Sequence, residues 1–267
     1  MSELDPTAIA RLADTIRLRA LRMVAPHGFG YLGQALSSAE IFATLYGCHY
    51  RPERDDIVIS PGHYIISAFA AAPELELLDE RELSSYGFDD SQLEAIGTER
   101  SPSVDLTGGS LGMGLSGAVG FALANRLLGR HQARVFALLS DGELEEGQVW
   151  EAAMFAAHNR LSSLTVLLDA NDSQVDGPVS SITTLEPIAA KWEAFGWFAR
   201  DVDGHDVSAI DGALSQALEA PQPGVVICRT STRQGLSVLP AEADGHFITL
   251  SPELTAAAAA ELEARLA

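Results

Sequence analysis

The sequence has little positive charge. Its 267 residues include 17 lysines and arginines against 37 aspartates and glutamates, a formal net charge of −20 at pH 7. A surface of this charge repels nucleic acid and anionic membranes, so we expect neither as a partner. A phosphate-bearing ligand would need a metal ion or backbone dipoles to hold it.

The sequence also has few cysteines and no long apolar run. We find no internal repeat and no long linker. Cys48 and Cys228 lack CxxC spacing and have apolar neighbours, a pattern that predicts buried free thiols. The first twenty residues, MSELDPTAIARLADTIRLRA, are amphipathic and mixed in charge, which is typical of neither a signal peptide nor a membrane span. We therefore expect a cytoplasmic protein.

Apolar residues make up 47% of the chain, enough for a substantial core. Short apolar segments alternate with helical ones, as in a parallel sheet that is covered on both faces. We predict an α/β fold, a doubly wound and mainly parallel sheet with helices on both faces, formed by residues 1–267 as a single domain. An irregular acidic stretch, residues 74–103, interrupts the pattern and is interpreted as a binding loop. The expected strands are 57–60, 134–139, 164–168, 197–201 and 225–229, and the expected helices are 7–24, 37–46, 62–72, 111–129, 146–160, 186–195, 206–220 and 252–266.

Two acidic turns follow two of the expected strands. Asp141 comes directly after VFALLS, and Asn171 lies shortly after LTVLLD. Parallel α/β sheets bind ligands at the carboxyl ends of their strands, and carboxylate, amide and carbonyl oxygens suit Mg²⁺ or Ca²⁺. Either turn alone is typical of ordinary turn chemistry. One helix and one strand separate the two, so we expect them at neighbouring strand ends.

The stretch SDGELEEGQVWEAAMFAAHNRL, followed by LLDANDSQVDG, resembles the thiamine diphosphate motif of transketolases. The resemblance extends over about residues 10 to 250. It implies that Asp141 and Asn171 are side-chain metal ligands, that Ser173 offers its backbone carbonyl, and that Gly142 lets the backbone approach the diphosphate. The implied cofactors are thiamine diphosphate and Mg²⁺ (or Ca²⁺). Ser140 replaces the first glycine of the family's usual turn.

A glycine-rich segment, residues 108–117, opens an expected helix. Glycines there permit close backbone approach, either to a ligand or to a neighbouring helix. The segment resembles the transketolase GSLGQG sequence, with Met113 in place of glutamine. The resemblance implies that Gly109, Ser110 and Leu111 line the rings of the cofactor.

Two histidines resemble family histidines that contact the cofactor phosphate. His63 lies in ISPGHY and His246 in DGHF. A lone histidine is more often structural, so the assignment rests on the resemblance.

The residues expected on the substrate side depart from the family pattern. In GYLGQALSSAEI, Tyr31 stands where the family has a histidine that faces the donor sugar, and His27 would replace it only if the loop is rearranged. The histidine of the family's GHP sequence is missing, with Thr98 or Arg100 near the gap. We therefore expect a thiamine-bound acyl carbanion, as in the family, but a donor that is not an ordinary ketose phosphate.

Four glutamates follow the first acidic turn. Glu146 matches a family glutamate near the cofactor at the subunit interface, although an acidic residue in a first helical turn is also favoured by the helix dipole. We expect Glu143, Glu145 and Glu151 at the solvent or on the helix surface, and Glu143, beside Gly142, is also counted among the cofactor-binding candidates.

The resemblance implies a pyrimidine-binding domain that carries the glutamate needed to activate thiamine, and we expect this domain on a separate chain. We therefore predict the N-terminal subunit of a split transketolase, which works with a separate C-terminal subunit, in an α2β2 assembly, on a small-molecule substrate. A subunit that uses a 2-oxo acid donor with decarboxylation and a non-catalytic scaffold are the alternatives.

Overall fold

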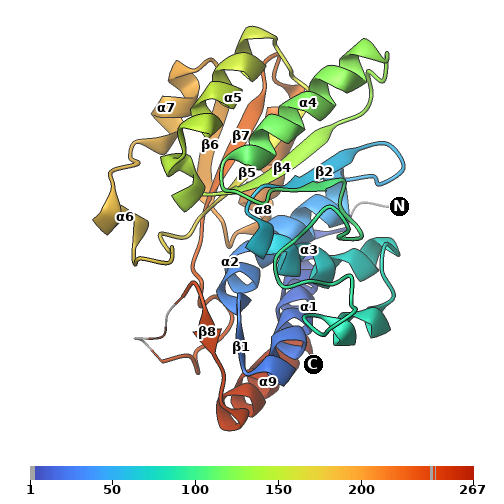
Figure 1. The fold of residues 1–267 in the computed structure, drawn as a ribbon, viewed down its shortest axis with the longest axis vertical. Helices are drawn as coiled ribbons and strands as arrows, with labels where there is room; N and C mark the ends of the chain where they lie inside the picture. The colour runs from blue at the N-terminus through green and yellow to red at the C-terminus, as the bar shows by residue number, and fades with distance from the viewer. Residues whose placement is uncertain (1–3, 241–242, 244) are drawn as a thin grey trace.

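The computed structural model describes residues 4–240, 243 and 245–267. Its main sheet has six parallel strands in the order β3-β2-β4-β5-β7-β6 (Figure 1). The predicted α/β class and parallel sheet are confirmed, and each expected strand is found within two residues of its predicted ends. The strands are β2 Asp56–Ile59, β3 Leu106–Thr107, β4 Val135–Ser140, β5 Leu164–Ala170, β6 Phe198–Asp203 and β7 Gly224–Arg229.

Helices cover both faces of this sheet because its central strands are apolar on both sides. Alternate residues of β4 belong to different cores, since Phe136 and Leu138 lie in one buried cluster and Val135 and Ala137 in the other. The first core includes residues of α1 Pro6–Val24, α2 Leu32–Thr44, α3 Ile65–Ala71, α8 Val207–Glu219 and α9 Pro252–Leu266. The second includes residues of α4 Met113–Leu127, α5 Gly147–His158 and α7 Ile188–Ala194, and α6 Val179–Ile182 is a single turn.

Side-chain caps mark the starts of α1, α8 and α9. Asp5 caps α1 by accepting a hydrogen bond from the Ala8 amide (2.8 Å), and Ser251 caps α9 through the Leu254 amide (3.1 Å).

The start of α2 was predicted five residues too late. Its first turn contains Gly33, which reads as a loop residue, but a Cβ at this position would lie 1.8 Å from the Gly245 carbonyl oxygen. Gly33 is therefore required because the backbone at Gly245 passes too close to this helix for any side chain.

The structure also contains a small second sheet that the sequence pattern did not predict. β1 Phe29–Gly30 pairs antiparallel with β8 Ile248–Thr249. These two strands join segments more than 200 residues apart and bring Tyr31 next to His246, with ring centroids 5.8 Å apart. Figure 1 shows the pair below the main sheet, beside α2 and α9.

Other features of the chain agree with the composition. Cys48 and Cys228 are buried and unbridged, as predicted. Within the described ranges, no helix combines the length and the apolar character needed to cross a bilayer.

Candidate active site

The two acidic turns lie side by side at the carboxyl edge of the sheet. β4 and β5 are neighbours, and their register pairs Ser140 with Asp169, so that Asp141 and Asn171 follow directly from adjacent strand ends. A cavity of about 350 Å³ opens at this edge. Its lining includes eight of the predicted site residues, namely Tyr31, His63, Gly109, Leu111, Gly142, Glu143, Ser173 and His246.

Asp141 is a buried carboxylate held by backbone amides. Its oxygens accept hydrogen bonds from the amides of Gly142 (2.9 Å) and Asp172 (2.7 Å), and its side chain forms no ion pair with a cationic residue of the described chain. Burial raises its pKa to about 7, and the nearby Asp169 adds to the rise. A buried carboxylate without a cation is costly, and a bound divalent ion would compensate it.

Asn171 is oriented by its neighbours. Its amide nitrogen donates to the Tyr64 hydroxyl (2.9 Å) and to Asp169 (3.0 Å), which directs its oxygen toward the other side, where it accepts from the Ser173 amide (3.0 Å). No group of three or more His, Cys, Asp or Glu side chains in the described residues could hold a metal. A metal site here would therefore depend on Asp141, Asn171 and a backbone carbonyl. Mg²⁺ commonly has only a few protein ligands when phosphate and water complete its coordination.

Asp169 is a residue of this site whose role the sequence interpretation missed. It is fully buried and accepts hydrogen bonds from Ser37, Tyr64, Asn171 and Thr230. Burial raises its pKa, and these hydrogen bonds partly offset the rise. Asp169 thus holds the side-chain amide of Asn171 in one orientation by accepting a hydrogen bond from its nitrogen. Its position at the end of a buried strand, in the sequence Asp169-Ala170-Asn171, was the available signal.

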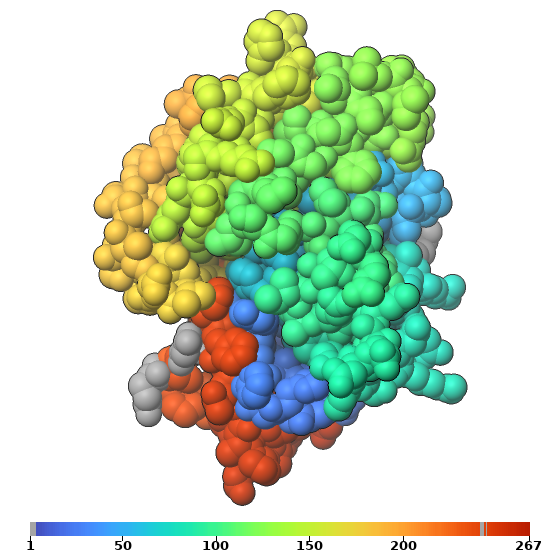
Figure 2. All heavy atoms as spheres, viewed as in Figure 1, coloured from blue at the N-terminus to red at the C-terminus, as the bar shows by residue number. Residues whose placement is uncertain are grey.

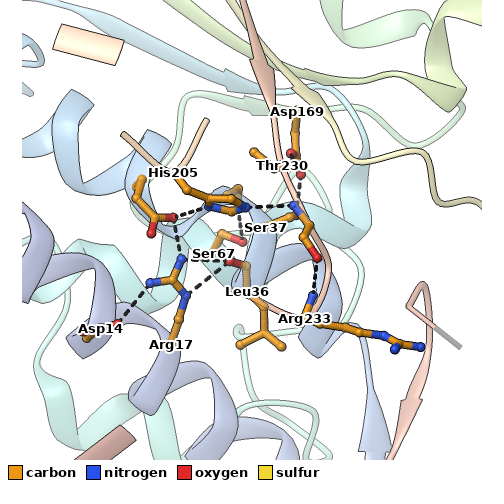
Figure 3. A network of polar contacts seen from close by, with 12 residues as sticks. Asp14, Arg17, Leu36, Ser37, Ser67, Asp169, His205, Thr230 and Arg233 are labelled. Atoms are coloured by element: carbon orange, nitrogen blue, oxygen red, sulfur yellow. Dashed lines mark hydrogen bonds and ion pairs between the residues drawn. The ribbon is translucent and has the colours of Figure 1, made fainter. Parts of the chain in front are cut away.

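A polar network extends from this carboxylate toward α1 (Figure 3). Arg17 forms a buried ion pair with Glu40, and its guanidinium also donates to the Leu36 carbonyl. His205 bridges Glu40 (3.2 Å) and the amide of Ser231 (2.9 Å). Because the Ser231 amide is a donor, Nε2 of His205 carries no proton and Nδ1 donates to Glu40. The network therefore fixes the segment that begins at Thr230, which hydrogen-bonds Asp169.

The aromatic side of the cavity is formed by His63, His246 and Tyr31. His63 and His246 lie with ring centroids 4.9 Å apart, and burial, with His246 as the second cause, lowers the pKa of His63 to about 3. Gln34 lies 3.1 Å from Nδ1 of His246 and donates to it through its amide nitrogen, which leaves the imidazole proton on Nε2. Tyr31 contacts both rings, with centroid distances of 5.1 and 5.8 Å, and also Phe247 at 5.2 Å.

The expectation that Glu143 faces solvent is wrong. Its side chain is fully buried, and one oxygen accepts hydrogen bonds from the Ser60 hydroxyl and the Gly112 amide (2.7 Å). The other oxygen is buried without a hydrogen-bond partner. Burial raises the pKa of Glu143 to about 7. This carboxyl therefore joins the Asp141 turn to the end of β2 and to the glycine-rich segment. Glu145 and Glu151 are exposed, as predicted.

The glycine-rich segment serves two purposes. A Cβ on Gly108 or Gly114 would approach the Ser60 backbone to 2.1 or 2.4 Å, so these glycines are required by packing. A Cβ on Gly109 would meet no atom within 4 Å, and Gly109 lines the cavity. Gly109 and Leu111 are thus placed to contact a ligand.

Five predicted residues do not line the cavity: Asp141 and Asn171 at the adjacent strand ends, and His27, Ser110 and Glu146. His27 is turned toward the 74–103 segment, where Nε2 donates to the Tyr86 carbonyl (2.7 Å) and the ring contacts Phe88. It therefore does not replace the family histidine at position 31 in this structure. Ser110 and Glu146 are exposed, and their proposed roles remain predictions. The 74–103 segment itself supplies Ile96 to the cavity lining.

Comparison with known proteins assigns the family. The family model described as "Transketolase, thiamine diphosphate binding domain" matches residues 9–262, so the chain belongs to the transketolase family through this domain. The chain is 41% identical to the transketolase family protein y4mO of Sinorhizobium fredii, with 90% of each chain covered. It is 36% identical to the 6-deoxy-6-sulfo-D-fructose transketolase subunit SqwG of a Clostridium species, with 94% of each chain covered.

A solved structure supports the same assignment. The transketolase of Campylobacter jejuni superimposes with a TM-score of 0.85 at 25% identity, over 97% of this chain and 43% of that one. The predicted family and fold are thereby confirmed. The chain spans less than half of this solved transketolase.

Proposed function

We propose that this chain is the cofactor-binding subunit of a two-component transketolase, which transfers a two-carbon unit between small molecules. The observation that carries the proposal is a cavity lined by His63, Gly142 and His246, at the edge of the sheet where Asp141 and Asn171 follow adjacent strand ends, in a chain of the transketolase family. The likeness to SqwG, which is named a transketolase subunit and has a similar length, supports a separate partner.

The described residues fit thiamine diphosphate. Gly109 leaves open space beside the cavity, and Gly142 also lines it, so that a ring or a diphosphate could approach the backbone at these positions. His63 is a neutral imidazole because burial lowers its pKa, and both His63 and His246 would hydrogen-bond a phosphate oxygen. When bound, thiamine diphosphate supplies the carbon nucleophile for two-carbon transfer, and the protein orients it. The glutamate that activates the cofactor would come from the pyrimidine-binding domain of the partner.

A divalent cation, Mg²⁺ or Ca²⁺, would be held by Asp141, Asn171 and the carbonyl of Ser173. The buried charge of Asp141 favours such an ion, and Asp169 holds the amide of Asn171 in one orientation. The ion would also allow this acidic chain to accept a diphosphate.

The donor is proposed to differ from an ordinary ketose phosphate. Tyr31, a phenol, occupies the place of a family histidine, and burial lowers the pKa of the adjacent His63 so that it is uncharged. The described residues that line the cavity include no lysine or arginine to attract an anionic donor. Turnover should be measured with xylulose 5-phosphate alongside pyruvate and other 2-oxo acids. Efficient use of xylulose 5-phosphate would overturn this part of the proposal, and decarboxylation of a 2-oxo acid would favour the alternative donor.

An exposed apolar surface on α4 and α5 supports the partner. The two helices lie next to each other on the face shown in Figure 2. Their exposed residues Met113, Met154 and Phe155 are 51%, 51% and 47% accessible. Exposed apolar side chains on neighbouring helices would be covered at an interface. We propose that the C-terminal subunit covers them in an α2β2 assembly. Two buried free thiols agree with the proposed cytoplasmic location.

The test is calorimetric titration with thiamine diphosphate and Mg²⁺, using the chain together with the product of the neighbouring reading frame. Metal-dependent binding and two-carbon transfer by the pair, with little turnover by the chain alone, are expected. Full activity of the isolated chain would contradict the split arrangement. Absence of metal-dependent binding in the presence of the partner would favour a scaffold.

A further inference from the structure

A second cavity lies at the opposite edge of the sheet from the cofactor cavity. It measures about 140 Å³, below the roughly 300–1,000 Å³ typical of sites for larger ligands. Its lining comes from the end of α4 and from the segments that precede β4 and β5. We refer to it as the basic cavity, because four of its lining residues are Arg126, Arg130, His131 and Arg160.

This concentration of positive charge is unusual for the chain. Acidic residues outnumber lysines and arginines by 37 to 17, and seven arginines of the described residues form ion pairs with carboxylates. In the cavity beside Asp141, for example, Arg229 is paired with both Asp201 and Glu186. Within the described part of the chain, Arg126, Arg130 and Arg160 form no ion pair.

The arginines of the basic cavity are held by carbonyl groups instead. Arg126 donates to the Asn159 carbonyl (2.5 Å) and Arg130 to the Arg54 carbonyl (3.2 Å). Each of these contacts uses one nitrogen of a guanidinium that has five N–H donors, so most donors stay available. Acidic residues of neighbouring segments are already hydrogen-bonded: Asp55 accepts from Arg54, Asp56 from Asn125, and Asp105, which interacts electrostatically with Arg130, from the Ile57 amide.

The backbone at Arg160 adds an independent observation. Arg160 directly follows the C-cap of α5 and has φ of 50°, in the left-handed region where glycine is favoured. The corresponding position after α4 is Gly129, with φ of 73°. The chain thus places an arginine where the backbone favours glycine. The helix dipole favours one cation at each helix end, but it does not account for Arg130 and His131 on the same cavity.

We propose that the basic cavity binds a tetrahedral oxyanion of the phosphate class, either free phosphate or the phosphate group of a small ester. Guanidinium forks match the oxygens of such an anion, and the hydroxyl groups of Ser162 and Ser163 line the same cavity. The site is separate from the cofactor cavity, which lies at the carboxyl ends of the strands, whereas Arg130 and Arg160 precede β4 and β5.

The test is calorimetric titration of the full chain at low ionic strength with inorganic phosphate, and in a second arm with glycerol 1-phosphate. Arg126→Gln combined with Arg160→Gly should weaken binding by at least about tenfold, because two guanidinium groups are removed. Arg160→Gly alone should also weaken binding while leaving the melting temperature equal or higher, because glycine suits the backbone at this position. This variant separates loss of the site from loss of the fold.

Two controls locate the binding. Arg200→Gln changes an exposed arginine that donates to Gln216 elsewhere on the surface, and it should bind phosphate like the original chain. His63→Ala changes the cofactor cavity and should also retain the phosphate response. Binding of both probes identifies an ester site, and binding of phosphate alone identifies a free-anion site. No detectable binding, equal binding by the arginine variants, or loss of binding in His63→Ala would overturn the proposal.

Discussion

Replacing Glu143 with glutamine should reduce the pH dependence of the chain's stability. Glu143 is fully buried, and its pKa of about 7 in the folded chain compares with about 4.5 in the unfolded one. Between these values the folded chain keeps a proton that the unfolded chain has lost. The carboxyl therefore lowers the free energy of unfolding as the pH rises through this window, and the loss is complete above the folded pKa.

The expected size follows from the shift. With about 1.4 kcal/mol for each pKa unit, ionisation of Glu143 costs roughly 2–3 kcal/mol of stability between about pH 5 and pH 8. Glutamine keeps an oxygen that accepts from Ser60 and Gly112 but cannot ionise. Relative to the original chain, the Glu143→Gln variant should therefore gain roughly 2–3 kcal/mol at the higher pH.

The assay is urea denaturation at both pH values in a metal-free buffer, with the free energy of unfolding as the readout. Glu145→Gln is the matched control, because Glu145 lies two residues away and is exposed. It should show no comparable gain. If the advantage of Glu143→Gln over the original chain is the same at both pH values, the carboxyl is not buried in the way that the structure shows.

Three further predictions concern the same edge of the sheet. Asp141→Ala should weaken Mg²⁺-dependent binding of thiamine diphosphate by at least about tenfold in calorimetry with the partner present, because a side-chain ligand is lost; undiminished binding would exclude Asp141 as a ligand. Asp169→Ala should lower the free energy of unfolding by roughly 3 kcal/mol in urea denaturation, since three buried donors and the partly buried Thr230 lose their acceptor; an unchanged midpoint would contradict this role. Tyr31→His should raise kcat/KM for xylulose 5-phosphate by about tenfold in the assembled enzyme, and an unchanged value would show that Tyr31 does not select the donor.

Local pattern was sufficient for most of the fold. The predicted helix 252–266 has the observed bounds of α9, since a serine cap and a run of alanines are signals contained within the segment. β4 and β5 were predicted from their apolar runs, and their adjacency followed from the single helix between them. The pairing of β1 with β8 has no such signal, because two-residue strands show no periodicity and their partners are remote in sequence.

The site was predictable where a motif names its residues and not where burial depends on distant contacts. Asp141 and Asn171 came from the resemblance to transketolases, and the sheet register places them as expected. In the sequence, Glu143 resembles an ordinary acidic residue in a first helical turn. Its burial depends on contacts with Ser60 and Gly112, which are remote in sequence. The orientation of His27 likewise depends on Tyr86, which lies in an irregular segment.

The short β1–β8 ladder has a consequence for how the protein is made. Tyr31 adjoins β1 and His246 lies close before β8, so these two sides of the cofactor cavity meet only after nearly the entire chain has left the ribosome. The earlier segments must therefore fold without help from a ligand. The supply of thiamine during growth should then influence the lifetime of the folded subunit rather than the yield of its synthesis.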